Sequence, residues 1–454
     1  MAGMRILITN NTLANRAGSE LYVRDIATAL LARGHTPIAF STVLGDVANE
    51  LRAATVPVVD SLDDVATPPD IIHGQHHLET MIALLHFPNT PAVSFCHGWL
   101  PWEEIPPRFP RIMRYVAVDH TCRDRLMFEN GIPEDRIRVL FNFVDLERFK
   151  RRGPLPARPK RALVFHNNAN EHQPLEIVRE ACYRAGIALD IIGLDSGTAC
   201  AHPAQVLGDY DIIFAKARSA IESMAVGAAV ILFNLTTIGS MVTTSALDRL
   251  RPLNFGIRAL QEPVTLEALE REIARYDAND AARVSERIRS TAGLDSAVEE
   301  ILGLYREAIG EFAIVERDTE NELRAASDYL RTLSPRVKED ARLNADRDEL
   351  QRELNRLRQD GFATSDSPDN QEIRRLVQQI EECERNSEEL VDMIRKQEQK
   401  AFALENNLAA KEHELARLTN TFGWRLLSRY GPIKYRFVLP AYRRLQKLFS
   451  AKPR

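Results

Sequence analysis

Short apolar runs alternate with helical patterns from Arg5 to about Phe149. A second series of the same kind starts at Ala162 and reaches Phe233. Each run is short enough to be a buried strand, and the residues between runs are apolar at helical spacing. Because strands that alternate with helices form parallel sheets covered on both faces, the pattern predicts an α/β fold with two Rossmann-like domains.

The segment 150–159 separates the two series. It holds three prolines and four basic residues, which exclude regular structure and favour a linker. We therefore predict an N-terminal domain at residues 1–150 and a C-terminal domain at residues 160–314. The helical patterns between Leu266 and Phe312 either close the second domain or pack back across the first.

Beyond Val315 the apolar residues fall into heptads, so we predict a long α-helical coiled coil at residues 315–420. One long solvated helix is the alternative. A shorter seam lies upstream of an interruption at 361–368, which is either a hairpin or a flexible joint. The coiled coil predicts a homo-oligomer or a partner with a matching helix. Its a positions are Ile373, Ile380, Ser387, Ile394, Ala401, Leu408 and Leu415, and its d positions are Leu376, Cys383, Leu390, Gln397, Leu404, Lys411 and Leu418.

The last segment, 421–454, has no acidic residue, and its basic residues interleave with aromatic ones. This composition suits the headgroup region of an anionic bilayer, and apolar clusters such as Phe437-Val-Leu give it an amphipathic character. We predict a membrane-associating tail. RNA binding and docking to a partner protein are the alternatives, and we expect no nucleic acid.

Charge, cysteine content and the lack of long apolar segments limit the class of protein and its cellular compartment. The net charge of −5 over 454 residues excludes a general polyanion binder. The five cysteines are scattered without metal or disulfide spacing, the start reads as a buried strand rather than a signal peptide, and no stretch is apolar enough to span a membrane. We expect a cytoplasmic protein that is peripheral at the inner face of the plasma membrane.

Two positions favour a binding site. The turn at Ala17-Gly-Ser leads from a strand into a helix, whose free amides suit a diphosphate, and a glycine needed simply to make the turn is the alternative. His97 ends an apolar strand, at the edge where α/β sites form. The group His73, His76 and His77 suggests a metal, but it lacks matched carboxylates or cysteines, so we predict no metal. The pair Asp209 and Asp211 reads as a simple turn.

Several segments, in order, resemble the family 4 glycosyltransferases, and together they cover about Met4 to Phe312. The segment 131–149 is the most specific of them, because it is similar to the hinge signature of the family. The others are the helix that ends in Ala29-Leu-Leu-Ala-Arg-Gly-His, the strands Pro69-Asp-Ile-Ile-His and Val93-Ser-Phe-Cys-His-Gly, the stretch that starts at Val116, and the donor-site helix Ile221-Glu-Ser-Met-Ala-Val-Gly.

The resemblance implies the GT-B fold, in which residues 1–150 take the acceptor and residues 160–314 take a nucleotide sugar. Glu222 then accepts hydrogen bonds from the ribose, and a solvated glutamate is the alternative. Gly18 and Ser19 lie against the diphosphate or the acceptor, and the catalytic His97 faces the sugar. The domains close about the hinge at Asn142. The expected donor-binding residues are Gly18, Ser19, Asn142, Asn167, Lys216, Arg218, Ser219 and Glu222.

The chain also departs from the family pattern. The family places an arginine and a lysine after the first strand of its second domain, but the segment 165–173 has neither. The first of two paired glutamates is replaced by Phe214. Lys216 and Arg218 are the nearest basic residues that can neutralise the diphosphate, and solvated surface charges are the alternative.

These features predict a retaining, metal-independent glycosyltransferase without a cofactor. It moves a sugar from a nucleotide-sugar donor to a lipid-linked or polysaccharide acceptor in cell-surface glycan synthesis, for example of O-antigen. Two alternatives stay open. One is an inactive GT-B scaffold whose coiled coil recruits assembly partners, and the other is a sugar-nucleotide epimerase.

Overall fold

The computed structural model describes residues 3–167, 173–193, 197–198, 200 and 202–360. The chain divides into two compact units, Met1–Ser334 and Pro335–Arg454, and the first contains both α/β domains. The predicted heptads from Ile373 onward and the basic tail at 421–454 lie outside the described residues.

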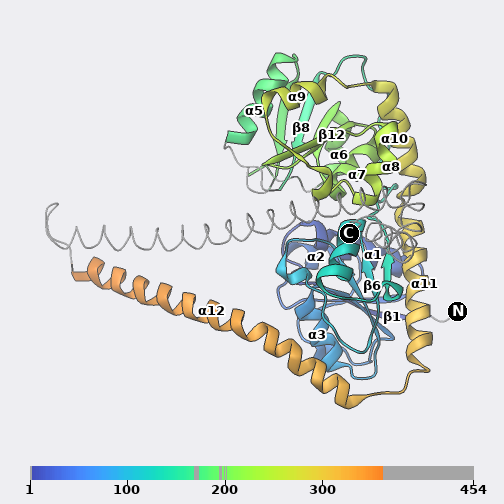
Figure 1. Cartoon of the computed structure of the whole chain (residues 1–454), viewed down its shortest axis with the longest axis vertical. Coiled ribbons are helices and arrows are strands. Elements are labelled where there is room, and N and C mark those ends of the chain that lie inside the picture. The colour runs from blue at the N-terminus through green and yellow to red at the C-terminus, as the bar shows by residue number, and fades with distance from the viewer. Residues whose placement is uncertain (1–2, 168–172, 194–196, 199, 201, 361–454) are drawn as a thin grey trace, which may run out of the picture. The chain divides into compact units, whose positions relative to one another are not determined.

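The N-terminal domain is built on a seven-stranded parallel sheet (Figure 1). Its strand order is β3-β2-β1-β4-β5-β6-β7, so the chain starts in the middle of the sheet and adds strands on both sides. The strands are β1 (Arg5–Thr9), β2 (Thr36–Phe40), β3 (Val58–Val59), β4 (Ile71–Gln75), β5 (Ala92–Cys96), β6 (Ile112–Ala117) and β7 (Ile137–Val139).

Helices cover both faces of this sheet. Ile6 and Ile8 of β1 point into one hydrophobic core, and Leu7 between them points into the other. The first core includes α1 (Gly18–Ala32), and the second includes α3 (His77–His86). The smaller helices are α2 (Asp46–Ala53) and α4 (His120–Asp124). Because both faces of the sheet are buried, consecutive residues of each strand must be apolar, which explains the uninterrupted apolar runs in the sequence.

The C-terminal domain has a six-stranded sheet in the order β13-β12-β11-β10-β8-β9. Strands β8 to β11 are parallel, as predicted, whereas β12 and β13 add an antiparallel edge that the sequence pattern does not predict. The strands are β8 (Arg161–Phe165), β9 (Ala188–Ile192), β10 (Ile212–Ala215), β11 (Ala229–Phe233), β12 (Thr237–Met241) and β13 (Glu262–Pro263).

Two pairs of helices cover the faces of the second sheet. One core contains side chains of α7 and α10, and the other contains side chains of α5 and α9. The prediction of two Rossmann-like domains is therefore confirmed. The helices of this domain are α5 (Gln173–Arg184), α6 (Pro203–Val206), α7 (Ala217–Val226), α8 (Thr244–Leu250), α9 (Leu266–Ile273) and α10 (Ala278–Thr291).

Helix α11 (Leu294–Phe312) returns to the N-terminal domain. Its residues Val298, Ile301 and Tyr305 are buried in the same core as α1. Both positions expected for the helical patterns between Leu266 and Phe312 therefore occur, because α9 and α10 close the second domain and α11 packs back across the first. The chain thus crosses between the domains twice, and the crossings touch where the Val144 amide donates to the Ala292 carbonyl at 2.8 Å.

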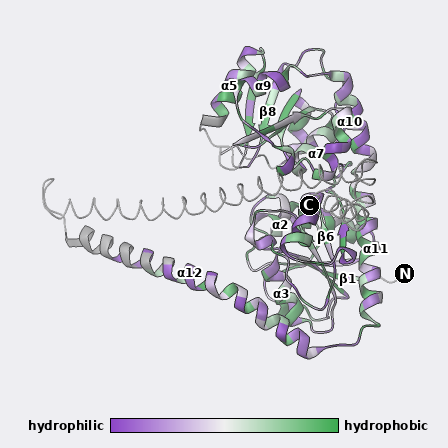
Figure 2. Cartoon of the chain, viewed as in Figure 1, coloured by the Kyte–Doolittle hydropathy of each residue, from purple (hydrophilic) through white to green (hydrophobic). Residues whose placement is uncertain are grey.

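Helix α12 (Thr319–Asp360) follows, with Pro335 inside it. Its start packs on the N-terminal domain, where Glu322 accepts from the buried Arg111 Nε at 3.0 Å and Ala325, Ala326 and Tyr329 contact the core beside α3. In Figure 2, β8 is hydrophobic whereas hydrophilic residues recur along α12. Among the described residues, no helix combines the length and apolarity that crossing a membrane requires.

Candidate functional site

The carboxyl edge of the first sheet gathers two histidines and a glutamate. His76 follows β4 and His97 follows β5, and these parallel strands are neighbours, so both residues emerge at the same edge. Buried Glu104 joins them. Its Oε1 lies 3.4 Å from His76 Nε2, and its Oε2 accepts from the His97 backbone amide at 2.8 Å. Glu104 thereby fixes the backbone at His97.

The His97 ring lies against Tyr22 of α1, with ring centroids 4.6 Å apart in an edge-to-face contact. Its Nε2 is buried and has no hydrogen-bond partner among the described residues. Burial lowers the pKa of His97 to about 4, so the ring is neutral near pH 7. A neutral imidazole with one unused nitrogen is suited to a sugar hydroxyl.

The three histidines of the group at 73–77 have different partners. His73 Nδ1 lies 2.6 Å from the Tyr305 hydroxyl, and its ring stacks on Phe95. His77 Nδ1 lies 2.7 Å from the hydroxyl of Tyr329 on α12. They serve the packing of three different segments rather than converging on one point.

The carboxyl edge of the second sheet brings together one residue from each of three strand ends. His166 follows β8, Lys216 follows β10 and Asn234 follows β11. Asn234 Oδ1 accepts from His166 Nε2 at 2.9 Å and from Lys216 Nζ at 3.1 Å. Burial lowers the pKa of Lys216, so the ammonium gains from an anion beside it. α/β folds bind ligands at this edge.

Helix α7 starts at this edge, directly after Lys216. The Ala217 amide donates to the Phe255 carbonyl at 3.0 Å, so the amides that follow it and the positive end of the helix dipole add to the attraction for an anion. The Ser219 hydroxyl donates to the Lys216 carbonyl at 2.8 Å, which fixes the first turn. Ala217 has φ of 48°, a left-handed conformation that costs energy for a residue with a side chain. Strain of this kind concentrates at binding sites.

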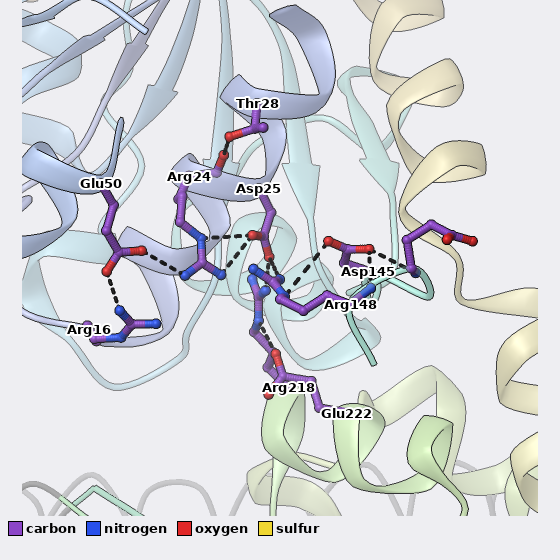
Figure 3. Close-up of polar contacts among 10 residues, drawn as sticks. Arg16, Arg24, Asp25, Thr28, Glu50, Asp145, Arg148, Arg218 and Glu222 are labelled. Atoms are coloured by element: carbon purple, nitrogen blue, oxygen red, sulfur yellow. Dashed lines mark hydrogen bonds and ion pairs between the residues drawn. The ribbon is translucent and has the colours of Figure 1, made fainter. Parts of the chain in front are cut away.

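In the first turn of α7, Arg218 connects the two domains (Figure 3). Its Nε donates to Glu222 Oε1 at 2.9 Å, and its Nη2 pairs with Asp25 of α1. Burial alone would lower the pKa of Arg218, but Asp25 and Glu222 more than offset it and raise the pKa. The guanidinium also lies 5.9 Å from the centre of the Phe143 ring. Arg218 is a buried cation between domains.

Arg218 and Glu222 are largely buried and Lys216 is half-buried, so none of the three is a fully solvated surface charge. The side chains of Arg218 and Glu222 are 12% and 7% exposed. The Lys216 ammonium is half-buried against Asn234. Charges in such positions require partners, and here they have each other or a polar neighbour.

The remaining predicted residues, Gly18, Ser19, Asn142 and Asn167, make few side-chain contacts with the residues above. Gly18 begins α1 with open space where a side chain would be, while the Ser19 hydroxyl donates to Glu20 Oε2 at 2.9 Å. Asn142 contributes its carbonyl, which accepts from Arg251 Nη2 at 2.7 Å. Asn167 is exposed at the turn after His166.

Sequence reasoning missed Asn234, Glu104 and Asp25. Asn234 could have been found, because it follows an apolar strand as His97 does. Asp25 gave no signal, since it occupies an ordinary polar position within a helical pattern, and Glu104 lies in an irregular segment. Their importance depends on contacts with residues distant in the sequence.

Two further arginines of the second domain face aromatic rings in the first domain and the hinge. Arg251 lies 5.1 Å from the ring centre of Phe141, and Arg258 lies 5.2 Å from that of Trp99 and pairs with Asp124. Each geometry permits a cation–π interaction. The described interface between the domains is therefore rich in arginine and aromatic contacts.

Comparisons with known proteins agree with this architecture. Residues 16–148 match the family model of Glycosyltransferase Family 4. The chain is similar in structure to a glycosyltransferase from Rickettsia africae ESF-5, with 17% identity, 68% of this chain and 99% of that chain covered, and a TM-score of 0.51. Searching curated proteins gave no significant match.

Two more solved structures resemble the chain less closely. One is Anabaena Alr3699/HepE in complex with UDP and glucose, with 14% identity, 67% of this chain and 100% of that chain covered, and a TM-score of 0.48. The other is the apo form of the lipopolysaccharide outer core galactosyltransferase WaaB, with 12% identity, 65% and 99% covered, and a TM-score of 0.42.

The Rickettsia structure supports the fold, and the family match covers most of the first domain. The chain is a glycosyltransferase of the GT-B fold, and its residues 16–148 match Glycosyltransferase Family 4.

Proposed function

We propose that the chain binds a nucleotide sugar at the carboxyl edge of its second domain and transfers the sugar, with retention of configuration and without a metal, to an acceptor hydroxyl. The observation that carries this proposal is the edge formed by half-buried Lys216, Arg218 and the start of α7. Lys216 supplies positive charge, and Arg218 and the α7 amides supply hydrogen-bond donors, where the leaving diphosphate develops negative charge.

This edge also compensates for the departure from the family pattern. The segment after β8 has no arginine or lysine, whereas Lys216 and Arg218 follow β10. Because β8 and β10 are parallel neighbours, their carboxyl ends lie at the same edge of the sheet. His166 supplies a polar group at the usual position and reaches Lys216 through Asn234. The charge is therefore moved to another strand end rather than lost.

In the proposed reaction, the bond between the sugar and the diphosphate breaks as the acceptor hydroxyl approaches. Lys216 and the α7 amides stabilise the departing phosphate oxygens, and Glu222 accepts from the ribose hydroxyls. Neutral His97 offers its unused Nε2 to the sugar on the other side. Closure about the hinge at Asn142 excludes water, which would otherwise hydrolyse the donor.

The acceptor in this proposal is a lipid-linked or polysaccharide chain of cell-surface glycan synthesis, such as O-antigen. It fits the basic aromatic composition of residues 421–454, which suits the anionic inner face of the membrane where lipid-linked acceptors lie. A coiled coil at 315–420 would join copies of the enzyme or a partner there.

A thermal shift measurement with nucleotides and nucleotide sugars tests the proposal. We expect at least one nucleotide sugar to stabilise the wild-type protein and not Glu222→Ala. Mass spectrometry of lipid-linked glycans from cells with and without the gene then identifies the product. If no nucleotide stabilises the wild type and the glycans are unchanged, the enzymatic proposal fails.

One observation favours a second candidate, the inactive scaffold. Phe214, which replaces the first paired glutamate, is fully buried and packs edge to face with Phe233 at 5.9 Å between ring centres. This position belongs to the core and offers nothing to a ligand. A scaffold predicts no nucleotide binding, and an epimerase predicts conversion of the donor without any acceptor.

A further inference from the structure

Asp25 is a single buried carboxylate surrounded by three arginines. Its Oδ1 accepts from Arg24 Nη2 at 2.9 Å, and its Oδ2 accepts from Arg148 Nη2 at 2.8 Å and also pairs with Arg218. The Asp25 side chain is 3% exposed. Figure 3 shows it on α1 between the three guanidinium groups. Of these arginines, only Arg218 comes from the second domain.

The nitrogens of Arg218 are used unequally. Nε donates to Glu222, and Nη2 pairs with Asp25. Nη1 is buried and has no hydrogen-bond partner among the described residues. A buried donor without a partner is destabilising, and more so when the group is charged. A guanidinium held on two sides with one donor unused is arranged to receive an anion on the third.

The surrounding charges balance. Four arginines, Arg16, Arg24, Arg148 and Arg218, meet four carboxylates, Asp25, Glu50, Asp145 and Glu222. A ligand therefore gains little from surplus positive charge in this cluster. It gains from the position of a donor, and that position depends on the carboxylates that hold the guanidinium.

Asp25 is able to act as a fixed anion. Its burial would raise the pKa of the carboxyl, but Arg218, Arg24 and Arg148 together lower the pKa far below its usual value. The carboxylate is thus ionised at any working pH. Arg24 and Arg148 hold it in place, so it can hold Arg218 in turn.

We propose that Asp25 is a positioning residue that reaches from the first domain to hold Arg218, so that the unpaired Nη1 binds a phosphate oxygen of a nucleoside diphosphate. This inference rests on the proposed function. It also links the two domains to donor binding, because the cation belongs to one domain and the group that orients it belongs to the other.

The test is the affinity of the full-length protein for nucleoside diphosphates and for the matching nucleosides. The probes are UDP, GDP, ADP and dTDP, with uridine, guanosine, adenosine and thymidine. We expect Asp25→Asn to weaken the best-bound diphosphate by about tenfold or more, because a charge-assisted hydrogen bond is disturbed. Binding of the nucleoside should change less than about twofold, since it has no phosphate.

A double-mutant cycle separates positioning from general damage. Arg218→Gln should cause a similar loss, and the double variant Asp25→Asn with Arg218→Gln should lose no more than either alone, because both act through one contact. Asp124→Asn removes the carboxylate of another ion pair between the domains, and it should leave diphosphate affinity unchanged.

Several results would overturn the inference. They are unchanged or tighter diphosphate binding by Asp25→Asn, an equal loss for diphosphate and nucleoside, or losses that add in the double variant. If Asp25→Asn does not fold, Asp25→Glu keeps the charge and must still lose diphosphate affinity selectively. If the wild type binds no diphosphate, the proposed function fails first, and that outcome is distinct.

Discussion

In the proposed donor site, Lys216 supplies the charge that the family motif places after the first strand of the second domain. It caps α7, lies half-buried at the end of β10, and has Asn234 as its hydrogen-bond partner among the described residues. Burial destabilises its charged form, so a bound diphosphate is more strongly attracted than it would be by a solvated lysine.

We expect Lys216→Gln to lower kcat/KM about a hundredfold, the usual effect of removing one donor that stabilises developing negative charge. The measurement is the initial rate of sugar transfer with the donor that the nucleotide panel identifies. Lys160→Gln, at an exposed lysine just before β8, is the matched control and should behave as the wild type. Equal rates for the wild type and Lys216→Gln would remove Lys216 from the site.

The buried His97 predicts a dependence of stability on pH. Its pKa is about 4 in the folded protein and about 6.5 in an unfolded chain. As the pH falls below 6.5, the unfolded state takes up the proton first, so the folded state loses stability down to about pH 4. Between pH 7.5 and pH 5 this loss is about 1–2 kcal/mol.

Urea denaturation at the two pH values measures this loss. His97→Asn should lose less free energy of unfolding on acidification than the wild type, whereas the same change at exposed His202 should make no difference. An identical pH dependence for the wild type and His97→Asn would show that His97 is not buried in neutral form.

Individual site residues could be predicted to different degrees. The positions of His97 and Glu222 follow from local pattern, because each lies beside an apolar strand or on a recognisable helix. Their roles stay predictions. Asp25 could not be predicted, since its partners Arg148 and Arg218 are 123 and 193 residues away in the chain. Only the fold, which places α1 beside Arg148 and beside the start of α7, brings them together.

At the scale of elements, α7 and the strand before it carry most of the donor-site geometry. The apolar runs and their alternation predicted β10, α7 and β11. The antiparallel strands β12 and β13 could not be predicted in the same way, because short edge strands have little periodicity. The position of α11 could not be predicted either, because its apolar face could pack on the core of either domain.

Two glycines, one at the end of α7 and one within α11, should respond in opposite ways to substitution by alanine. Gly227 has φ of 106°, a conformation that favours glycine, and an added Cβ would lie 3.4 Å from Arg152 Cγ. Gly227→Ala should therefore destabilise the protein by about 1–2 kcal/mol. Gly303→Ala within α11 has open space and no positive φ, and should stabilise it by about 0.5–1 kcal/mol.

Thermal or urea unfolding of the two variants checks this prediction. The sign of each change in the free energy of unfolding is the decisive result, because both substitutions add the same methyl group. A stabilising Gly227→Ala would contradict the left-handed conformation of Gly227 at the end of α7.

At the scale of the whole molecule, a catalytic pair of domains precedes a long charged helix and a basic tail. The tail was predicted from composition, and its proposed role is peripheral binding to anionic membranes. Each basic residue near such a surface contributes about 1 kcal/mol, so the segment 421–454 should dominate membrane binding.

Removal of residues 421–454 should abolish sedimentation with vesicles that contain anionic lipid, while neutral vesicles should bind neither form. The truncated protein should keep its affinity for nucleotide sugar, because the proposed donor site is formed by the two α/β domains, which the truncation leaves intact. Equal sedimentation of the two forms would place the membrane contact elsewhere, and binding of RNA by the tail would favour the alternative.

The central claim is that a nucleotide sugar binds at the carboxyl edge of the second sheet. A crystal structure of the full-length protein with the nucleoside diphosphate that it binds best tests this most directly. The account predicts phosphate oxygens within hydrogen-bond distance of Lys216 Nζ or the first amides of α7, with the ribose hydroxyls at Glu222. A diphosphate bound away from that edge, or a ribose that does not contact Glu222, would contradict it.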